Sequence, residues 1–204
     1  IATLARPNGF TEEHLRFAEM VGAQATLAVE NARLYADTLR LTRYDPLTGL
    51  ANRRYFVENL ASAVAVAERH ARALAVLMID VDRFKEVNDA HGHLAGDAVL
   101  RAIAGRVRRG LRAGDLPARY AGDELAVIVP ETDGEGAVAV AERLRAGVAD
   151  APITLDDGRA IAMTLSIGVG SYRPGNSADD LLHAADSAMY RAKQRGRNRV
   201  HAPA

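Results

Sequence analysis

Two stretches of the chain carry carboxylates at positions suited to chemistry. The apolar run ALAVLMI ends at Asp80, so this carboxylate is expected at the carboxyl edge of a buried strand, where the ligand crevices of such sheets open. Asp123 and Glu124 follow in a tight turn, AGDE, between two predicted strands. If that hairpin lies beside the Asp80 strand, the carboxylates converge and repel one another unless a cation intervenes. Mg²⁺ suits such a place, because it binds one or two carboxylates together with phosphate oxygens and water. The alternative is an ordinary acidic surface turn.

The segment after Asp80 is suited to binding phosphate without a glycine-rich loop. Asp82 is predicted to leave the strand and cap the next helix, which would turn the backbone N–H groups of Arg83 and Phe84 toward the crevice. A helix N-terminus attracts anions, and Lys85 adds a positive charge beside it. We therefore expect β- and γ-phosphate oxygens to bind here.

An amide and a carboxylate follow at a spacing that could read a purine base. Asn88 lies near the end of the predicted helix, Gly92 stops that helix, and Asp97 is expected to open the next one. A carboxylate paired with an amide matches the donors and the carbonyl on the Watson–Crick edge of guanine. Alternatively, Asp97 only stabilises a helix N-terminus. His91 and His93 lie nearby without a third soft ligand, so a zinc site is not favoured.

The composition excludes several classes of protein. The 204 residues carry 26 Lys and Arg against 26 Asp and Glu, so no excess positive charge is available to bind nucleic acid or an anionic membrane. Without cysteine, neither a disulfide nor a thiolate zinc site can form. The longest apolar run, Ala73 to Ile79, is too short to span a bilayer, and we expect a cytoplasmic location. Because the first residue is Ile, we expect a longer protein whose missing upstream domain carries a sensor or a membrane tether.

The first part of the chain predicts one long helix, from Thr11 to about Thr42, in which Gly22 is the only glycine. Small or apolar residues recur in it at alternating spacings of three and four, which is typical of a parallel two-stranded coiled coil. This seam comprises Ala18, Val21, Ala25, Ala28, Ala32, Tyr35 and Leu39. Equally, the same face could pack on a domain that lies outside this sequence.

The pattern changes after Arg43, where the turn-rich stretch DPLTGLANRR marks a domain boundary between residues 42 and 43. Helices are then predicted at 52–69, 83–90, 97–111, 136–149 and 178–195, and strands at 74–80, 118–120, 125–129, 152–155 and 160–169. Helices mixed with hairpin-joined strands indicate an α+β domain with a mixed central sheet flanked by helices.

Three motifs together resemble the GGDEF domain of diguanylate cyclases. They are DxDxFKxxND at Asp80 to Asp89, GHxxGD at Gly92 to Asp97, and RYAGDEL at Arg119 to Leu125. DPLTGLANRR and the terminal YRAKQRGRNRV are also similar to that family, so the resemblance covers about residues 43–201. The stretch AVENARLYADTL is similar to the exit of a GAF sensor domain, which would make residues 1–42 a sensor remnant and signalling helix.

The resemblance implies a specific reaction and specific roles. Two GTP molecules, one on each of two facing domains, would be joined into cyclic di-GMP with release of pyrophosphate. The helix before Arg43 would hold the homodimer together. The implied metal ligands, for two Mg²⁺ ions that Mn²⁺ can replace, are Asp80, the Val81 carbonyl, Asp123 and Glu124, with Asp123 also a candidate proton acceptor. The implied nucleotide contacts are Asn88 and Asp97 to guanine, and Phe84, Lys85, Lys193 and Arg197 to phosphates.

A second site is implied by an RxxD motif, Arg112 and Asp115, which in that family binds the product and inhibits the enzyme. Arg143 on the following helix would be a second clamp, because arginine forks suit phosphates and guanine edges. The alternative is a charged turn with a single surface ion pair.

Two residues depart from the family pattern: Ala121 stands for the first glycine and Leu125 for the phenylalanine. Leucine keeps an apolar plug, but alanine adds a Cβ where the backbone could approach the nucleotide or need a positive φ. The extra Cβ could then narrow the site or cost about 1 kcal/mol. Retained activity is expected. The rival hypotheses are a degenerate domain that senses GTP or cyclic di-GMP, a cyclase with another product, and a purely structural dimerisation domain.

Overall fold

The computed structural model describes residues 11–155 and 157–203, with the backbone alone described for residues 31–42. Contacts within the chain divide it into two units, one ending at Thr42 and the other running from Arg43 to Ala204. Each unit is therefore described by itself.

The first unit is dominated by helix α1, which runs from Glu12 to Arg43 and confirms the long helix predicted there. Its first turn carries two glutamates, which complement the positive end of the helix dipole. The Thr11 hydroxyl oxygen accepts a hydrogen bond from the His14 backbone N–H at 3.3 Å, as expected of a residue that begins a helix.

The predicted coiled-coil seam lies partly within the described side chains. Ala18, Val21, Ala25 and Ala28 are exposed in the single chain, whereas the seam positions 32, 35 and 39 lie outside the described side chains. Larger apolar side chains are exposed on α1 as well, among them Phe17 at 62%. In the part of the chain that the structure describes, no helix is long and apolar enough to cross a membrane.

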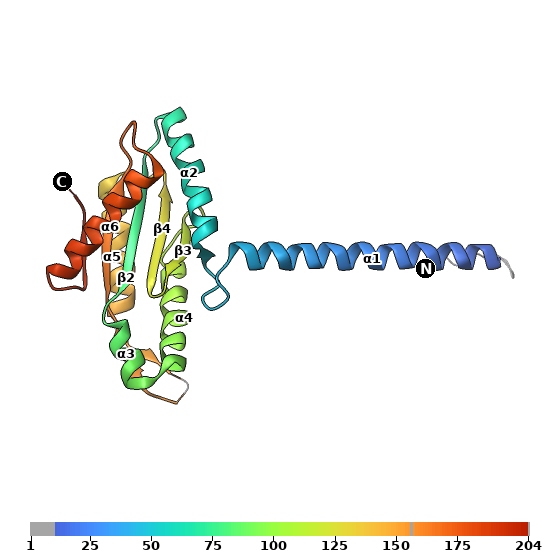
Figure 1. Ribbon diagram of the computed structural model, residues 1–204, viewed down its shortest axis with the longest axis horizontal. Coiled ribbons are helices and arrows are strands. Elements are labelled where there is room, and N and C mark those ends of the chain that lie inside the picture. The colour runs from blue at the N-terminus through green and yellow to red at the C-terminus, as the bar shows by residue number, and fades with distance from the viewer. Residues whose placement is uncertain (1–10, 156, 204) are drawn as a thin grey trace. The chain divides into compact units, whose positions relative to one another are not determined.

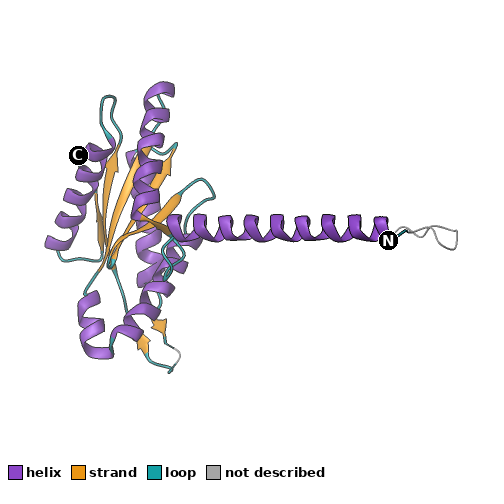
Figure 2. Cartoon of the chain, turned by 45° about the vertical axis from the view of Figure 1, so that its right-hand side comes forward, coloured by secondary structure: helices purple, strands orange, loops and turns teal. Residues whose placement is uncertain are grey.

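The second unit is built on a β-sheet between helices (Figure 2). The sheet has six strands in the order β1-β3-β4-β2-β7-β8. Its central strand β2 pairs antiparallel with β4 and β7, while the edge strands β1 and β8 pair parallel with β3 and β7. The strands are β1 Ala51–Asn52, β2 Leu74–Val81, β3 Leu116–Ala121, β4 Glu124–Pro130, β7 Leu165–Ser171 and β8 Arg199–His201. The mixed sheet flanked by helices confirms the predicted fold class.

Helices cover both faces of this sheet, as alternation along β2 requires (Figure 1). Leu77 and Ile79 point into a core shared with α4 and α5, while Val76 and Met78 point into a core shared with α2 and α6. The helices of this unit are α2 Arg53–His70, α3 Phe84–His91, α4 His93–Arg109, α5 Gly134–Ala149 and α6 Ala178–Gln194. The result is three layers in which β2 is buried along nearly its whole length.

Helix α6 lies unusually close to strand β7. A Cβ at Gly168 would collide with the backbone of α6 at Ala185 and Met189, and a Cβ at Gly170 would come within 2.5 Å of the Leu181 carbonyl oxygen. Only glycine permits this approach. The sheet therefore fixes the position of α6, and with it the residues at the C-terminal end of that helix.

Three predictions of local structure differ from the fold. The strand expected over 160–169 is two strands: β6, Ala160–Ile161, pairs with β5, Ile153–Thr154, in a separate two-stranded sheet, and β7 joins the main sheet. The edge strands β1 and β8 were not predicted, because two or three residues are too few to show a period. Helix α4 begins at His93, so Asp97 lies inside the helix rather than opening it.

Candidate active site

The carboxylates singled out from the sequence lie on two neighbouring strands. Asp80, at the end of β2, is in register with Glu124, the first residue of β4. The Val81 backbone N–H donates to the Asp123 carbonyl oxygen at 3.3 Å, so the turn before β4 lies beside the end of β2. The expectation that the hairpin flanks the Asp80 strand is therefore confirmed by the strand register.

The hairpin turn is shaped by a local irregularity. The register between β3 and β4 shifts between Arg119 and Ala121, and Gly122 has a positive φ of 44°. The left-handed position is thus occupied by the glycine that the chain retains. Ala121 is not among the residues with positive φ, so its Cβ imposes no backbone strain of that kind. Leu125 is 1% exposed and fills the core as an apolar plug.

The carboxylates crowd one another electrostatically. Burial raises the pKa of Asp80 above its ordinary value, Lys193 opposes that shift, and the charges of Asp123 and Asp82 add to it. Burial also raises the pKa of Glu124, with Asp80 and Asp123 among the contributing charges. One cation compensates directly, since the Lys193 Nζ lies 2.5 Å from the Asp80 Oδ2. A further cation bound beside Asp80, Asp123 and Glu124 would reduce the repulsion among these carboxylates.

The donor set fits a hard divalent cation. It offers carboxylate oxygens from Asp80, Asp123 and Glu124, and the backbone carbonyl of Val81 lies between them in the chain. Within residues 11–155 and 157–203, no three side chains of Asp, Glu or His already form a metal cage. An ion bound here would complete its coordination with groups from a ligand or water, which is the behaviour of Mg²⁺ rather than of structural zinc.

A cavity of about 360 Å³ opens next to these carboxylates. It brings together predicted nucleotide-binding residues from two motifs and the predicted metal ligand Asp123 from a third. Its lining comprises Phe84, Lys85, Asn88, His93, Asp97, Leu100, Arg119, Gly122 and Asp123. Asp80, Glu124, Lys193 and Arg197 do not line this cavity. His91 takes no part in it either, because its Nδ1 lies 2.9 Å from a guanidinium nitrogen of Arg159.

The position of Asn88 depends on Gly96 of helix α4. A Cβ at residue 96 would collide with the Asn88 Oδ1 and would lie 3.1 Å from the ring of Phe84. The glycine of the GHxxGD motif therefore lets α3 and α4 approach closely enough for Asn88 and Asp97 to line one cavity.

Asp82 does not cap α3, so that prediction was wrong. The residue before α3 is Arg83, in a left-handed conformation with φ of 58° and no side-chain cap. The Asp82 carboxylate instead accepts hydrogen bonds from the hydroxyls of Thr164 and Ser166, both at 2.6 Å, and from the Asn198 backbone N–H at 3.0 Å. The Asp82 carboxylate therefore bonds to residues far away in the chain and not to the first turn of α3.

The predicted phosphate-binding cations Lys193 and Arg197 lie at the end of α6 and in the turn that follows. Gly196, Arg197 and Asn198 all have positive φ, of 111°, 63° and 44°. This turn leads into β8, which pairs with β7. Both cations therefore sit close in sequence to a backbone conformation that L-residues rarely adopt.

Sequence reasoning missed an ion pair that supports the hairpin turn. The Arg119 guanidinium lies 3.2 Å from an Asp45 carboxylate oxygen and donates from Nε to the Gly122 carbonyl oxygen at 2.8 Å. Asp45 also accepts from the N–H and hydroxyl of Thr48, at 2.8 and 2.7 Å. Burial alone would raise the pKa of Asp45, but the bonds from Thr48 and Arg119 outweigh it and lower that pKa. The stretch DPLTGL was the available signal, although it does not identify Arg119 as the partner.

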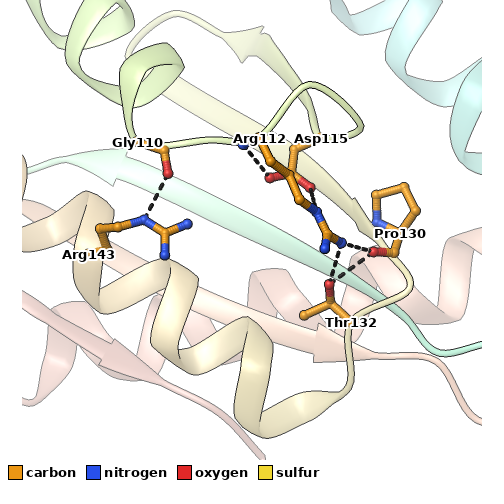
Figure 3. Close-up of polar contacts among 6 residues, drawn as sticks. All are labelled: Gly110, Arg112, Asp115, Pro130, Thr132 and Arg143. Carbon is orange, nitrogen blue, oxygen red and sulfur yellow. Dashed lines mark hydrogen bonds and ion pairs between the residues drawn. The ribbon is translucent and has the colours of Figure 1, made fainter.

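The predicted inhibitory residues lie around the loop that follows α4 (Figure 3). Asp115 is buried and accepts from both the backbone N–H and the Nε of Arg112, at 3.0 and 3.1 Å. The Arg112 guanidinium also donates to the Pro130 carbonyl oxygen and, at 2.8 Å, to the Thr132 hydroxyl. Arg143 donates to the Gly110 carbonyl oxygen at 2.9 Å, so it contacts the start of the same loop.

Comparison with known proteins places this geometry in one family. A family profile described as "Diguanylate cyclase, GGDEF domain" matches residues 42–199. The chain is 39% identical over 196 residues to Diguanylate cyclase A of Treponema denticola, covering 94% of this chain and 51% of that protein. It is 44% identical over 181 residues to Diguanylate cyclase TpbB of Pseudomonas aeruginosa, covering 88% of this chain and 40% of that protein. The chain thus spans about half or less of these relatives.

Solved structures agree with these matches. The coiled coil and GGDEF domain of DgcB from Caulobacter crescentus, in complex with c-di-GMP, superposes with a TM-score of 0.83 at 33% identity, covering 91% of this chain and 99% of that one. The GGDEF domain of TpbB from Pseudomonas aeruginosa gives a TM-score of 0.74 at 44% identity, covering 77% of this chain and 98% of that one.

Proposed function

This chain belongs to the GGDEF family of diguanylate cyclases, and we propose that it condenses two GTP molecules into one cyclic di-GMP and two pyrophosphates. The observation that carries the proposal is the register of β2 and β4, which puts Asp80 opposite Glu124 beside the cavity lined by Asn88 and Asp97. Relatives named as diguanylate cyclases, at 39% and 44% identity, support it.

Each residue has a distinct role in this proposal. Asn88 and Asp97 bind the guanine edge, and Phe84 with Lys85, Lys193 and Arg197 contact the phosphates. Asp80, the Val81 carbonyl, Asp123 and Glu124 would hold two Mg²⁺ ions. Mg²⁺ bound there would neutralise charge on the triphosphate and make the attacking hydroxyl easier to deprotonate.

The reaction takes place twice for each product formed. The 3′-oxygen of one GTP attacks the α-phosphorus of the other, a new P–O bond forms, and the bond to pyrophosphate breaks. The hydroxyl proton passes to Asp123. The leaving pyrophosphate is stabilised by the positive charges of Lys193 and Arg197. Because each catalytic domain is proposed to bind one GTP, two domains must face each other for both attacks to occur.

We further propose that residues 1–42 serve this pairing. A sensor remnant and signalling helix would join two chains through the exposed face of α1 and bring their catalytic domains together at a high effective concentration. The likeness to the coiled-coil structure of DgcB supports this assignment.

Product inhibition is proposed for the loop after α4. Arg112, Asp115 and Arg143 would bind cyclic di-GMP, since two guanidinium groups at one loop suit a doubly charged ligand. The buried Asp115 holds Arg112 in place and supports this role. Ligand binding would compete with the bonds that Arg112 makes to Pro130 and Thr132.

The decisive experiment incubates the chain with GTP and Mg²⁺ and measures cyclic di-GMP and pyrophosphate. We expect both in a ratio of one to two, and no product from the Asp123→Asn variant. Replacing GTP by ATP tests the guanine assignment and should give no product. Binding of cyclic di-GMP without any synthesis from GTP would favour the sensor hypothesis instead.

A further inference from the structure

We propose that Asp82 is a positioning residue that holds the turn after α6, and with it Arg197, in the place where that side chain meets the triphosphate. The proposal rests on the proposed function for the role of Arg197. It assigns to the second aspartate of the DxD motif a task different from metal binding and from helix capping.

The Asp82 carboxylate is the buried centre of a polar cluster. The residue is 5% exposed and Ser166 is 0% exposed, so the cluster is shielded from water. Its Oδ2 accepts from the Thr164 hydroxyl and from the Asn198 N–H, while its Oδ1 accepts from the Ser166 hydroxyl. Three donors converge on the two oxygens of this side chain, so its hydrogen-bonding capacity is used within the cluster.

The turn that this carboxylate holds is not favoured by its own sequence. Residues 196–198 all have positive φ, a conformation that glycine adopts freely and asparagine tolerates but that is costly for Arg197. Such conformations persist only where surrounding contacts enforce them. Two contacts from outside the turn converge on Asn198: the Asp82 carboxylate on its backbone N–H, and the Arg145 guanidinium on its side-chain oxygen at 2.8 Å.

The same carboxylate also anchors the strand that carries the candidate metal ligands. Asp82 follows Asp80 and Val81 directly, and its own backbone N–H donates to the Thr164 carbonyl oxygen at 3.0 Å. One buried side chain therefore ties the end of β2 to the turn that carries Arg197. Fixing these two segments to each other sets the spacing between the ligands of the metal and the groups that hold the phosphates.

The test uses a substrate analogue that binds without reacting. In 3′-deoxy-GTP the attacking hydroxyl is missing, and 3′-deoxy-GMP lacks in addition the two outer phosphates. We expect Asp82→Asn to weaken the binding of 3′-deoxy-GTP about tenfold, as for other residues that orient a binding group. Binding of 3′-deoxy-GMP should stay within about twofold, because its guanine contacts are untouched. In turnover, KM for GTP should rise about tenfold with kcat changed less than threefold.

The Ser166→Ala variant separates positioning from general stability. It removes a donor from the same carboxylate but leaves the Asn198 N–H in place, so it should lower the melting temperature and leave the affinity for 3′-deoxy-GTP unchanged. Glu86→Gln, an exposed carboxylate beside Arg83, controls for the loss of one negative charge near the phosphates. Equal weakening by Ser166→Ala, or equal weakening of both nucleotides by Asp82→Asn, would overturn the proposal.

A second variant protects the test against misfolding of Asp82→Asn. Arg145→Ala removes the other tether of the turn from helix α5, and should weaken 3′-deoxy-GTP by about two- to threefold. Its matched control is Glu142→Gln, which removes the negative charge 2.6 Å from the Arg145 Nε and keeps the bond from Arg145 to Asn198. If neither single variant, Arg145→Ala or Asp82→Asn, changes the binding of 3′-deoxy-GTP, the inference is contradicted.

Hydrogen exchange gives a result that does not depend on catalysis. Backbone amides of residues 195–199 should exchange faster in Asp82→Asn than in the wild type, while amides of α2 should not change. A wild-type chain that makes no cyclic di-GMP would refute the proposed function and leave this measurement to decide the role of Asp82. Unchanged exchange at 195–199 in an active enzyme would refute the role of Asp82 alone.

Discussion

Two half-buried carboxylates in this domain each form an ion pair with a basic side chain, yet their pKa values are shifted in opposite directions. Asp45 pairs with Arg119, and Asp80 pairs with Lys193. The pKa of Asp45 is lowered because Thr48 and Arg119 together outweigh its burial. The pKa of Asp80 is raised, because burial and the neighbouring acids outweigh a single lysine.

The difference separates a carboxylate whose charge stabilises the fold, Asp45, from one that we propose binds a ligand, Asp80. Asp45 has its hydrogen-bonding needs met within its own turn, so its charge is favourable in the folded protein. Asp80 lacks that compensation, and its charge is costly until a further cation arrives. Active sites commonly carry such strain, since groups arranged for a ligand are not optimal without it.

The comparison predicts first that Asp80→Asn removes activity. Loss of one proposed metal-binding carboxylate should reduce cyclic di-GMP formation at least about 100-fold, measured as initial rates at saturating GTP. Asp89→Asn, which changes an exposed acid of the same motif, should retain most of the rate. If Asp80→Asn keeps more than a tenth of the activity, the proposed distinction between a ligand-binding Asp80 and a fold-stabilising Asp45 is contradicted.

The second prediction concerns the stabilising member of the pair. Asp45→Ala leaves the partly buried Arg119 without its partner and should lower the free energy of unfolding by about 2 kcal/mol. Chemical denaturation measures this loss. Glu58→Ala is the control, because it breaks an exposed ion pair with Arg54 that is worth about 0.5 kcal/mol or less. An equal loss in both variants would show that the Asp45 pair is an ordinary surface contact.

A third change sharpens the comparison by testing shape instead of charge. Gly96→Ala introduces a Cβ that collides with Asn88, so KM for GTP should rise about tenfold while the charges at Asp80 and Asp45 stay the same. Gly105→Ala is the matched control on the same helix, because its nearest neighbour is the flexible end of Arg109 at 3.5 Å. Unchanged KM in Gly96→Ala would mean that Asn88 is free to move without loss of function.

The smallest expected effect is on the melting temperature, which neutralising Asp80 and neutralising Asp45 should change in opposite directions at pH 7. The folded pKa of Asp80 lies above its ordinary 3.8, so its charge reduces stability once pH has risen through that folded value. Asp80→Asn should therefore raise the melting temperature by about 2 °C at pH 7, and the gain should vanish near pH 4 and below.

Asp45 should show the reverse. Its folded pKa lies below 3.8, so its contribution to stability is present above that value and is lost as pH falls through the folded pKa. Asp45→Asn should lower the melting temperature at pH 7, with a smaller difference at pH 3. Thermal melts of the two variants over this range, without Mg²⁺ or nucleotide, check the signs, and equal signs would contradict the comparison.

The sequence predicted those parts of the site that depend on local pattern. Asp80 could be located because an apolar run ends there, and Asn88 because a short helix and Gly92 define its neighbourhood. Asp123 and Glu124 could be located in the turn between two predicted strands, but that Glu124 lies opposite Asp80 was only a condition, which the register of β2 and β4 meets. What could be predicted concerns single elements or two elements joined by a tight turn.

The parts that failed depend on partners far away in the chain. Asp82 is followed by a helix, and a local cap was the natural expectation, but its partners lie 82, 84 and 116 residues away. The pairing of Asp45 with Arg119 spans 74 residues. No period or propensity encodes such pairs, because they form only once the sheet has assembled.

The close seating of α6 on β7 has a consequence for how this domain tolerates sequence change. There is no room for any side chain at Gly168 or Gly170. In a library of substitutions at these positions, only variants that keep glycine should fold. Gly22 and Gly147 have no neighbouring atom within 4 Å and would accept alanine. Invariance at 168 and 170 would therefore be a mark of architecture, and reading it as a sign of catalysis would mislead.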